Sequence, residues 1–135
     1  MSGIAGKRIL ITRPREQADG LAAELEQLGA VPVLLPAIEI APMEDPAALD
    51  AAIETLGEFR WVIFTSANGV TAFWSRLGAL GKDENALAGL RVAAIGPATA
   101  RALEERGVRP DFVPTEHIAE AILPGLGEVR GQRIL

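Results

Sequence analysis

Apolar residues in the first part of the chain follow a strand pattern, then a helix pattern, then a strand pattern again. Arg8–Thr12 is a short apolar run, and the apolar residues of Arg15–Leu28 recur at helical spacing before a glycine stops the helix. Val31–Leu35 is a second apolar run that closes at a proline. The pattern predicts a β-α-β unit over residues 1–36, in which the two strands lie parallel.

The rest of the chain continues the same alternation of strands and helices. Neighbouring parallel strands need a crossover, which is usually a helix, so the alternation predicts an α/β protein. We expect a mainly parallel, doubly wound sheet of the flavodoxin-like or Rossmann-like kind. The predicted elements are a brief strand over Ile38–Ala41, a helix from the Asp45 N-cap to about Leu56, a strand over Trp61–Phe64, a helix capped by Ser66 or Asn68, a strand over Arg91–Ile95, a helix after Gly96 and Pro97, an extended segment over Pro110–Pro114, and a helix from Thr115 in which Ile118, Ile122 and Leu126 line one side.

The last five residues nearly repeat an earlier segment. Gly131–Leu135 reads GQRIL, and Gly6–Leu10 reads GKRIL. Both copies stand at the start of a predicted strand, which gives the match structural meaning. We therefore expect a second copy of the opening unit to begin near residue 131.

Composition narrows the possible functions. The 135 residues are 49% apolar but only 4% aromatic, so Ala, Val, Leu and Ile must form the core. The chain has no cysteine and a single histidine, His117, which excludes a disulfide framework and a thiolate site and makes a histidine metal cluster implausible. No metal is expected.

Charge and hydropathy argue against two classes of partner. The net charge is −5 and no basic stripe is visible, so the chain is not expected to bind nucleic acid. No apolar run reaches the roughly 18 residues of a membrane span, and Lys7 and Arg8 lead directly into the first strand rather than into a signal peptide. We expect a soluble, cytoplasmic protein with no membrane partner.

The candidate chemistry lies where the predicted strands end, because open α/β sheets bind ligands beyond the carboxyl ends of their strands. These ends supply hydroxyl, amide and glycine groups and one cation, but no carboxylate for Mg²⁺. No dinucleotide-binding or Walker A glycine pattern is present, and no nucleophile stands in register with the histidine. The residues are Arg13, Thr65, Ser66, Asn68, Gly69, Gly96 and Thr99.

These residues have structural as well as functional interpretations. Helix-start amides bind anions, so the turns are compatible with an anionic ligand. Ser66 and Asn68 equally suit simple helix capping, Gly96 a tight turn, and Arg13 a solvated strand end. Chemistry alone goes no further than a possible anion-binding pocket.

Three segments, in order, are similar to motifs of the uroporphyrinogen-III synthase family. They are Ile9–Pro14 (ILITRP), Val62–Val70 (VIFTSANGV) and Ala94–Ala100 (AIGPATA), and Gly107–Glu120 also resembles the family segment that follows the third motif. The resemblance covers essentially the whole chain, and the stretch FTSANG is its most specific part. It implies a protein about twice as long, with two α/β domains, a two-stranded linker and an active site between the domains. Residues 1–36 would belong to the first domain, possibly exchanged, and residues 37–135 to an incomplete second α/β domain.

The resemblance also implies a reaction. Family members take hydroxymethylbilane, eliminate its hydroxyl to give an azafulvene, and close the ring through a spiro intermediate at ring D. The product is uroporphyrinogen III, and no metal or cofactor is used. Because the same substrate closes unaided to the symmetric isomer, the main task of such a lyase is to fix conformation.

The resemblance assigns the strand-end residues to substrate binding. A substrate with eight carboxylates can be bound by helix-start amides and hydroxyls, with Arg13 adding a charge-assisted contact. In the family a tyrosine from the later part of the chain is the usual candidate for assisting hydroxyl loss, but this chain has no tyrosine. No catalytic residue is therefore assigned, and the chain alone is expected to be inactive.

Two other functions stay open, together with an expected assembly. The chain could be a non-catalytic anion- or ligand-binding module that keeps the fold, or a sugar- or nucleotide-binding flavodoxin-like protein. An isolated half of the fold leaves sheet edges uncovered, which favours a homodimer that exchanges residues 1–36 about a hinge between Pro36 and Pro42.

Overall fold

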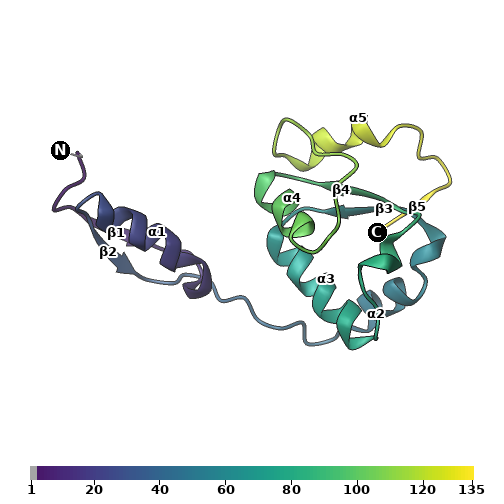
Figure 1. Cartoon of the computed structure of the whole chain (residues 1–135), viewed down its shortest axis with the longest axis horizontal. Coiled ribbons are helices and arrows are strands. Elements are labelled where there is room, and N and C mark those ends of the chain that lie inside the picture. The colour runs from purple at the N-terminus through teal and green to yellow at the C-terminus, as the bar shows by residue number, and fades with distance from the viewer. Residues whose placement is uncertain (1–2) are drawn as a thin grey trace. The chain divides into compact units, whose positions relative to one another are not determined.

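The computed structural model describes residues 3–135, which fall into two compact units, Met1–Pro42 and Met43–Leu135. We call these unit 1 and unit 2 and describe each by itself (Figure 1). Unit 1 contains a two-stranded sheet and unit 2 a three-stranded sheet, and every strand pair is parallel. The predicted α/β class is confirmed.

Unit 1 is a single β-α-β unit. It consists of β1 (Arg8–Ile11), α1 (Arg15–Gln27) and β2 (Val31–Leu34), and its two strands pair in parallel along their full length. Gly29 has a φ of +80°, a left-handed conformation that favours glycine, and it follows the end of α1. The elements predicted for this region are confirmed to within about one residue.

One face of the unit 1 sheet is left apolar and exposed. Ile11 and Ala18 are buried, whereas Leu10 is 55% exposed and Val31 is 50% exposed. Side chains alternate along a strand, and Leu10 pairs with Val33, so Leu10, Val31 and Leu35 share the face opposite Ile11. We call these three residues the open face. Parallel sheets normally have both faces covered, and this one does not.

Unit 2 begins with a short helix and continues as alternating strands and helices. Its elements are α2 (Ala47–Glu54), a 3-10 helix (Leu56–Glu58), β3 (Phe59–Phe64), α3 (Ala67–Ala79), a 3-10 helix (Glu84–Leu87), β4 (Arg91–Ala94), α4 (Pro97–Glu104), the 3-10 helix η3 (Ala119–Ile122), α5 (Leu123–Leu126) and β5 (Arg133–Ile134). The strand order is β4-β3-β5.

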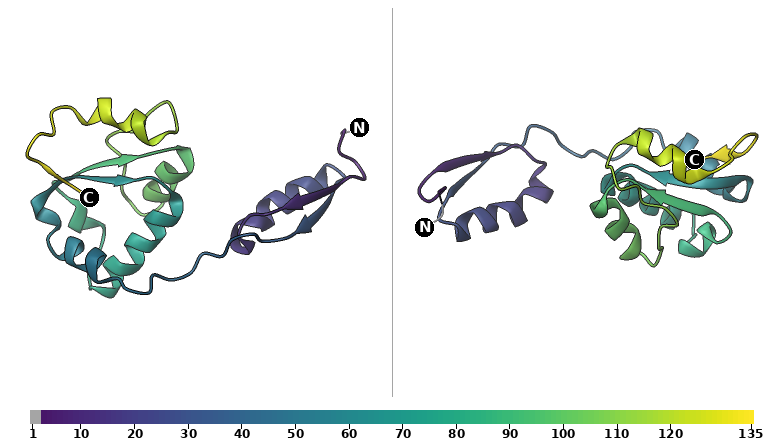
Figure 2. Two further views of the ribbon diagram at one scale, coloured as in Figure 1. Left: turned by 180° about the vertical axis from the view of Figure 1, so that it is seen from behind. Right: turned by 90° about the horizontal axis from the view of Figure 1, so that it is seen from above.

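Alternating residues of β3 and β4 divide the core of unit 2 between the two sheet faces. Val62 and Phe64 belong to a cluster with residues of α2, α3 and α4, including Leu77 and Leu103. Trp61 belongs to a second, smaller cluster with residues of β4, η3 and α5. Figure 2 shows α2, α3 and α4 on one side of this sheet and η3 and α5 on the other. Helical segments cover both faces, as the prediction of a doubly wound sheet requires.

The near-repeat at the end of the chain forms part of the unit 2 sheet. Arg133 and Ile134 form β5, which pairs in parallel with β3. Leu135 extends the pairing, because its N–H donates to Trp61 O at 3.0 Å and its carbonyl accepts from Ile63 N at 2.8 Å. The repeated sequence is therefore a strand in both places.

The strand predicted over Ile38–Ala41 is wrong. Within the described residues, this segment forms no strand pairing. A strand is defined by its ladder, so the β-like sequence alone does not make one here. The segment lies just before the boundary between the two units, at Pro42.

The helix predicted from Thr115 is also wrong in its start. Regular structure begins only with η3 at Ala119, and Ile118 has the extended dihedrals φ −122° and ψ 151°. Ile118 is 51% exposed, whereas Ile122 is buried. Because residues 115–118 are exposed, no apolar stripe is buried there, and burial of such a stripe is what stabilises most helices.

Candidate functional site

The candidate site of unit 2 lies at the carboxyl edge of its sheet, where β3 and β4 end side by side. The two strands pair from Trp61 to Phe64, and Ile95 N then donates to Phe64 O at 3.0 Å. This last bond carries the ladder to the edge, so the turns that begin at Thr65 and Gly96 lie next to each other.

The first turn is held by Ser66. Its backbone is extended, with φ −153° and ψ 154°, and its Oγ accepts a hydrogen bond from Gly69 N at 3.0 Å. Ser66 is thus the N-cap of α3, and Asn68 lies inside the helix. A Cβ at Gly69 would stand 3.3 Å from Ser66 Oγ, so glycine suits the close approach. Thr65, Ser66 and Asn68 lie at the surface, and all three are exposed.

The second turn is made by Gly96 and Pro97. Gly96 is the N-cap of α4 with a φ of +86°, and Pro97 occupies the start of the helix, where its lack of an N–H costs nothing. No described side chain caps this helix. Thr99 lies in the first turn as predicted, but it is only 3% exposed. Because its side chain is buried, Thr99 would serve an anion at this helix start through its backbone N–H rather than through its hydroxyl.

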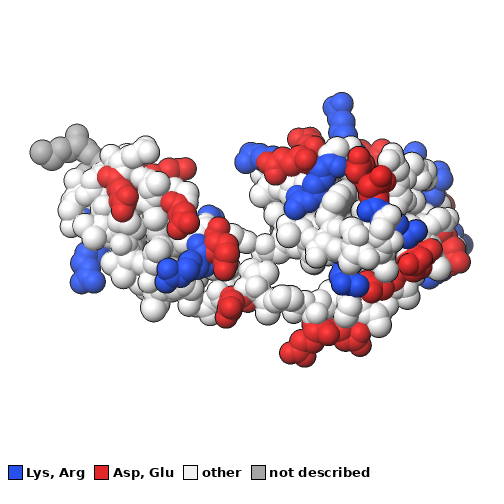
Figure 3. All heavy atoms as spheres, turned by 60° about the horizontal axis from the view of Figure 1, so that its bottom comes forward, with Lys and Arg blue, Asp and Glu red and all other residues white. Residues whose placement is uncertain are grey.

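The electrostatic character of this edge comes from helix ends rather than from charged side chains. None of the six candidate residues in unit 2 is charged, but two helix N-termini, each carrying partial positive charge, stand beside each other. Acidic and basic side chains intermingle on the face of each unit in Figure 3. The arrangement suits recognition of carboxylates by backbone and hydroxyl groups.

A third turn reaches the same edge and was missed by sequence reasoning. Phe112 forms a parallel bridge with Ala93, and its carbonyl accepts from Ala94 N at 3.0 Å. The chain leaves this bridge in the same direction as β4, so Pro114 and the exposed Thr115 follow toward the carboxyl edge. The available signal was the extended segment that ends at Pro114. Because Thr115 was predicted to start a helix, its position at this edge was not predicted.

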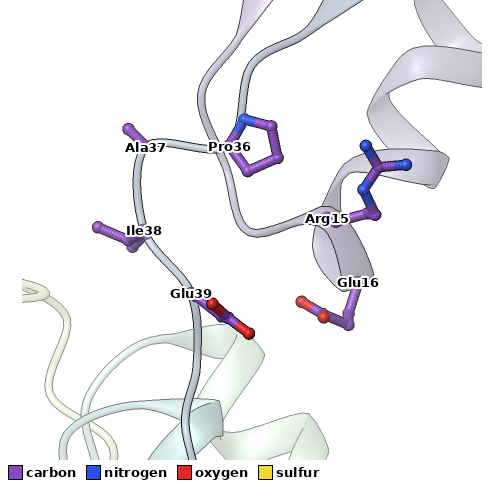
Figure 4. A pocket seen from close by; sticks show the side chains of 6 residues that line it. All are labelled: Arg15, Glu16, Pro36, Ala37, Ile38 and Glu39. Carbon is purple, nitrogen blue, oxygen red and sulfur yellow. The ribbon is translucent and has the colours of Figure 1, made fainter.

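Arg13 is separate from these residues because it belongs to unit 1. It follows β1 and is exposed, as a strand-end cation should be. Near it, a pocket of about 450 Å³ is lined by Arg15 and Glu16 at the start of α1 and by residues 36–39. Figure 4 shows the carboxylates of Glu16 and Glu39 pointing toward each other. Arg13 itself does not line this pocket.

The described residues were also compared with the requirements of a metal site and of a membrane-spanning helix. Within residues 3–135, no group of three or more His, Asp or Glu side chains could hold a metal ion. No helix of the same described residues is long and apolar enough to cross a membrane.

Comparison with known proteins gives a consistent result. The model of a family described as uroporphyrinogen-III synthase HemD matches residues 19–135. A porphyrin biosynthesis protein HemD of Ruminiclostridium josui is 39% identical over 127 residues, which are 91% of this chain and 25% of that protein. A uroporphyrinogen-III synthase of Synechococcus elongatus is 37% identical over 133 residues, which are 98% of this chain and 50% of that protein.

Solved structures resemble the fold as well. A mutant uroporphyrinogen III synthase of Thermus thermophilus matches with a TM-score of 0.64 and 29% identity, covering 88% of this chain and 47% of that one. The synthetase of Helicobacter pylori 26695 matches with a TM-score of 0.66 over 91% of this chain and 54% of that one, and at 24% identity it supports the fold alone. The chain thus spans about half the length, or less, of these relatives.

Proposed function

Because the chain belongs to the uroporphyrinogen-III synthase family, we propose that it is part of an enzyme that cyclises hydroxymethylbilane to uroporphyrinogen III. The reaction would be that of a cyclising lyase of haem biosynthesis, with inversion of ring D and no cofactor. Residues 1–36 would contribute to one domain and residues 37–135 to the second. The proposal rests on the family match over residues 19–135.

The observation that carries the substrate assignment is the pair of helix starts at one sheet edge. A linear tetrapyrrole bears many carboxylates, and helix N-termini bind anions through backbone N–H groups. The hydroxyl of Ser66 accepts from Gly69 N, which leaves its own hydrogen to donate to a substrate carboxylate. Thr65 and Asn68 supply further polar groups at the surface.

Gly96 and Thr99 would contribute through the backbone of the second turn. Glycine suits position 96 because its φ of +86° would strain a residue with a side chain. Space is not the reason, since an added Cβ would meet no other atom within 4 Å. The buried Thr99 side chain would hold the turn in place rather than contact substrate. Arg13, from unit 1, would add a charge-assisted contact to another carboxylate.

The chain by itself is proposed to be inactive. It spans about half the length of the Synechococcus relative, and it contains no tyrosine to assist loss of the substrate hydroxyl. A binding edge without the other side of a cleft cannot hold both ends of the linear substrate. Conformational control, which distinguishes this reaction from spontaneous closure, would then be lost.

The test is the identity of the product isomer. Hydroxymethylbilane is added to the complete enzyme that contains this sequence, and isomers I and III are separated. Ser66→Ala should lower the yield of isomer III, because it removes both the cap and a proposed contact. Ser75→Ala, an exposed serine farther along α3, is the matched control. Equal yields from both variants would contradict the site.

Two further variants, in the complete enzyme, probe the proposed contact of Arg13 and the turn that Thr99 would hold in place. Arg13→Ala should weaken binding of the polycarboxylate product, most strongly at low salt, because screening already weakens such contacts at high salt. Thr99→Ala should lower cyclisation beyond what its loss of stability explains. Unchanged product affinity at low salt would make Arg13 a bystander.

A second function remains a candidate because the edge supplies binding groups without an evident acid. A non-catalytic anion-binding module would bind the cyclic product but would give no isomer III above the spontaneous background. A sugar- or nucleotide-binding role would instead be supported by a nucleotide that copurifies with the protein. The cytoplasmic location stays a prediction.

We also propose that the isolated chain forms a homodimer by exchanging residues 1–36. Support comes from the open face, where Leu10, Val31 and Leu35 are all at least half exposed. A two-stranded sheet is only marginally stable by itself, and an exposed apolar face favours association with another chain. Light scattering at micromolar concentration should give about twice the chain mass. Deletion of residues 1–36 should restore the monomer.

A further inference from the structure

The third turn at the carboxyl edge continues into a loop that holds the only histidine of the chain. Phe112 pairs in parallel with Ala93, and the chain beyond it runs past the end of β4. Pro114 is buried, and every residue of the range 115–120 is exposed. Residues 115–118, which we call the edge loop, therefore reach the solvent and carry His117.

The return path of the chain fixes the position of the edge loop. Ile122 shares the smaller cluster with Ile95, the last residue before the second turn. Gly125 then lies against the Phe112 ring, and β5 begins opposite Phe59, at the amino end of β3. The chain thus runs back over the sheet from its carboxyl edge to its amino edge, and it reverses at the edge loop. Figure 1 shows this yellow-green loop at the same end of the sheet as the starts of α3 and α4.

The proposed reaction needs a proton donor, which the first two turns do not supply. A hydroxyl is a poor leaving group until it is protonated, and the six candidate residues of unit 2 offer only hydroxyl, amide and glycine groups. The edge loop adds two titratable side chains, Glu116 and His117. Carboxyl groups in water are ionised at neutral pH, whereas imidazole is available there in its protonated form and donates through either ring nitrogen.

We propose that His117 is the general acid that protonates the leaving hydroxyl of hydroxymethylbilane. The assignment rests on the proposed function and names a catalytic residue for it. The imidazolium N–H gives its proton to the hydroxyl oxygen as the C–O bond breaks, and the electron pair of that bond leaves with the oxygen as water. The tetrapyrrole is left as the protonated azafulvene and His117 as neutral imidazole. The proton that the tetrapyrrole loses after ring closure returns to the imidazole, so the net reaction releases water alone.

The helix starts and the edge loop have separate tasks in this arrangement. The amides at the starts of α3 and α4 hold substrate carboxylates, which sets the position of the linear chain over the edge. His117 acts on the terminal hydroxymethyl group from the adjacent turn. Loss of the imidazole should therefore slow departure of the hydroxyl and leave binding of the substrate largely intact.

Steady-state kinetics of the complete enzyme that contains this sequence test the assignment. His117→Ala should lower kcat for isomer III by about 100-fold or more, the usual contribution of a general acid. KM should change by less than about threefold, because the carboxylate contacts remain. The position is exposed, so the variant should fold like the native protein. Glu116→Ala, at the neighbouring exposed position, is the matched control and should keep kcat within about twofold.

Chemical rescue distinguishes a proton donor from a residue that only shapes the loop. Free imidazole should raise the kcat of His117→Ala by about tenfold, because an imidazolium ion can enter the space of the missing side chain and donate in its place. The same imidazole should not restore Ser66→Ala, whose expected defect lies in substrate binding.

The outcomes separate this assignment from the proposed function. If the native enzyme forms isomer III and His117→Ala keeps its kcat, the assignment is wrong and the proposed function stands. A loss of kcat that imidazole does not restore, or that Glu116→Ala shares, also overturns the assignment. If the native enzyme forms no isomer III above the spontaneous background, the proposed function is wrong and the assignment with it. A selective loss at position 117 that imidazole rescues supports both.

Discussion

The two units of this chain differ in how far their sheets are covered. Unit 2 has apolar clusters on both faces of β3 and β4, built from helices that precede and follow these strands. Unit 1 buries Ile11, Pro14, Ala18 and Ala30 among its described residues and leaves its open face exposed. Alternating strands and helices therefore form a core on both sheet faces in unit 2 but on only one sheet face in unit 1. The difference is that helical segments pack on both faces of the unit 2 sheet, whereas unit 1 has one helix on one face.

The largest expected effect comes from separating the units. A chain of residues 43–135 should fold, and its unfolding followed by tryptophan fluorescence should match that of the full chain, since Trp61 and Trp74 both lie in unit 2. A chain of residues 1–42 should show no cooperative unfolding, because one helix on a two-stranded sheet cannot offset its conformational entropy. A cooperative melt of the isolated unit 1 in circular dichroism would remove the contrast.

Matched leucine truncations should reproduce the contrast within the intact chain. Leu103→Ala, at a fully buried position of unit 2, should cost about 2–5 kcal/mol of unfolding free energy. Leu10→Ala, on the open face, should cost less than about 0.5 kcal/mol when the chain is dilute enough to be monomeric. Denaturant unfolding measures both. A cost at Leu10 as large as that at Leu103 would show that the open face is covered after all.

A glycine pair sharpens the comparison between the two faces of unit 2. A Cβ at Gly125 in α5 would stand 2.1 Å from the Phe112 ring, so Gly125→Ala must displace that ring from the smaller cluster. We expect a loss of about 1–3 kcal/mol. Gly78→Ala in α3 has open space around the new methyl group and should stabilise the helix by up to about 1 kcal/mol. Equal melting temperatures for the two variants would contradict the tight fit of α5.

The smallest effect concerns the ion pair that joins α2 to α3. Two hydrogen bonds link Arg76 to Asp50, at 2.8 Å from Nε to Oδ1 and 2.7 Å from Nη2 to Oδ2. The hydrogen bond from Arg76 lowers the pKa of Asp50 below its ordinary value of 3.8. A lowered pKa in the folded state contributes stability above pH 3.8 that is lost as the pH falls through the folded-state value.

The corresponding experiment compares the native chain with Asp50→Asn at two pH values. The unfolding free energy of the native chain should exceed that of the variant by a small margin at pH 7, and this margin should shrink at about pH 2. Unit 1 has no ion pair among its described residues, so the margin belongs to unit 2 alone. A margin that does not change with pH would disprove the pKa shift.

Local sequence signals predicted the elements well wherever their partners were also local. Gly29 and Gly96 marked a helix end and a helix start, and both have positive φ. Asp45 was predicted as an N-cap, but the N-cap of α2 is Pro46, one residue later. Asp45 Oδ1 still accepts from Ala47 N at 2.9 Å, so the signal marked the helix start to within one residue. These signals are carried by a few neighbouring residues, so one sequence suffices to find them.

The errors fell where structure depends on distant partners. Ile38–Ala41 has strand propensity but no neighbouring strand among the described residues, and Ile118 has helical spacing but no surface to cover it. At the site, the alternation of strands and helices predicted that the turns at Thr65 and Gly96 follow strands, but it did not show that Arg13 follows a strand of a separate sheet. It could not predict that Thr99 is buried or that Thr115 reaches the same edge, since both depend on how distant segments pack, as when Phe112 pairs with β4.

The placement of β5 has a consequence for folding during synthesis. On the ribosome, β3 and β4 can pair as soon as both have emerged, well before residues 133–135 exist. Until then the other edge of β3 is an unpaired strand in a protein whose first 42 residues already expose apolar side chains. The nascent chain therefore passes through a stage in which the free edge of β3 and the apolar side chains of unit 1 are exposed at the same time. A chaperone that binds extended apolar segments would be needed most during that interval, and least once Leu135 has joined the sheet.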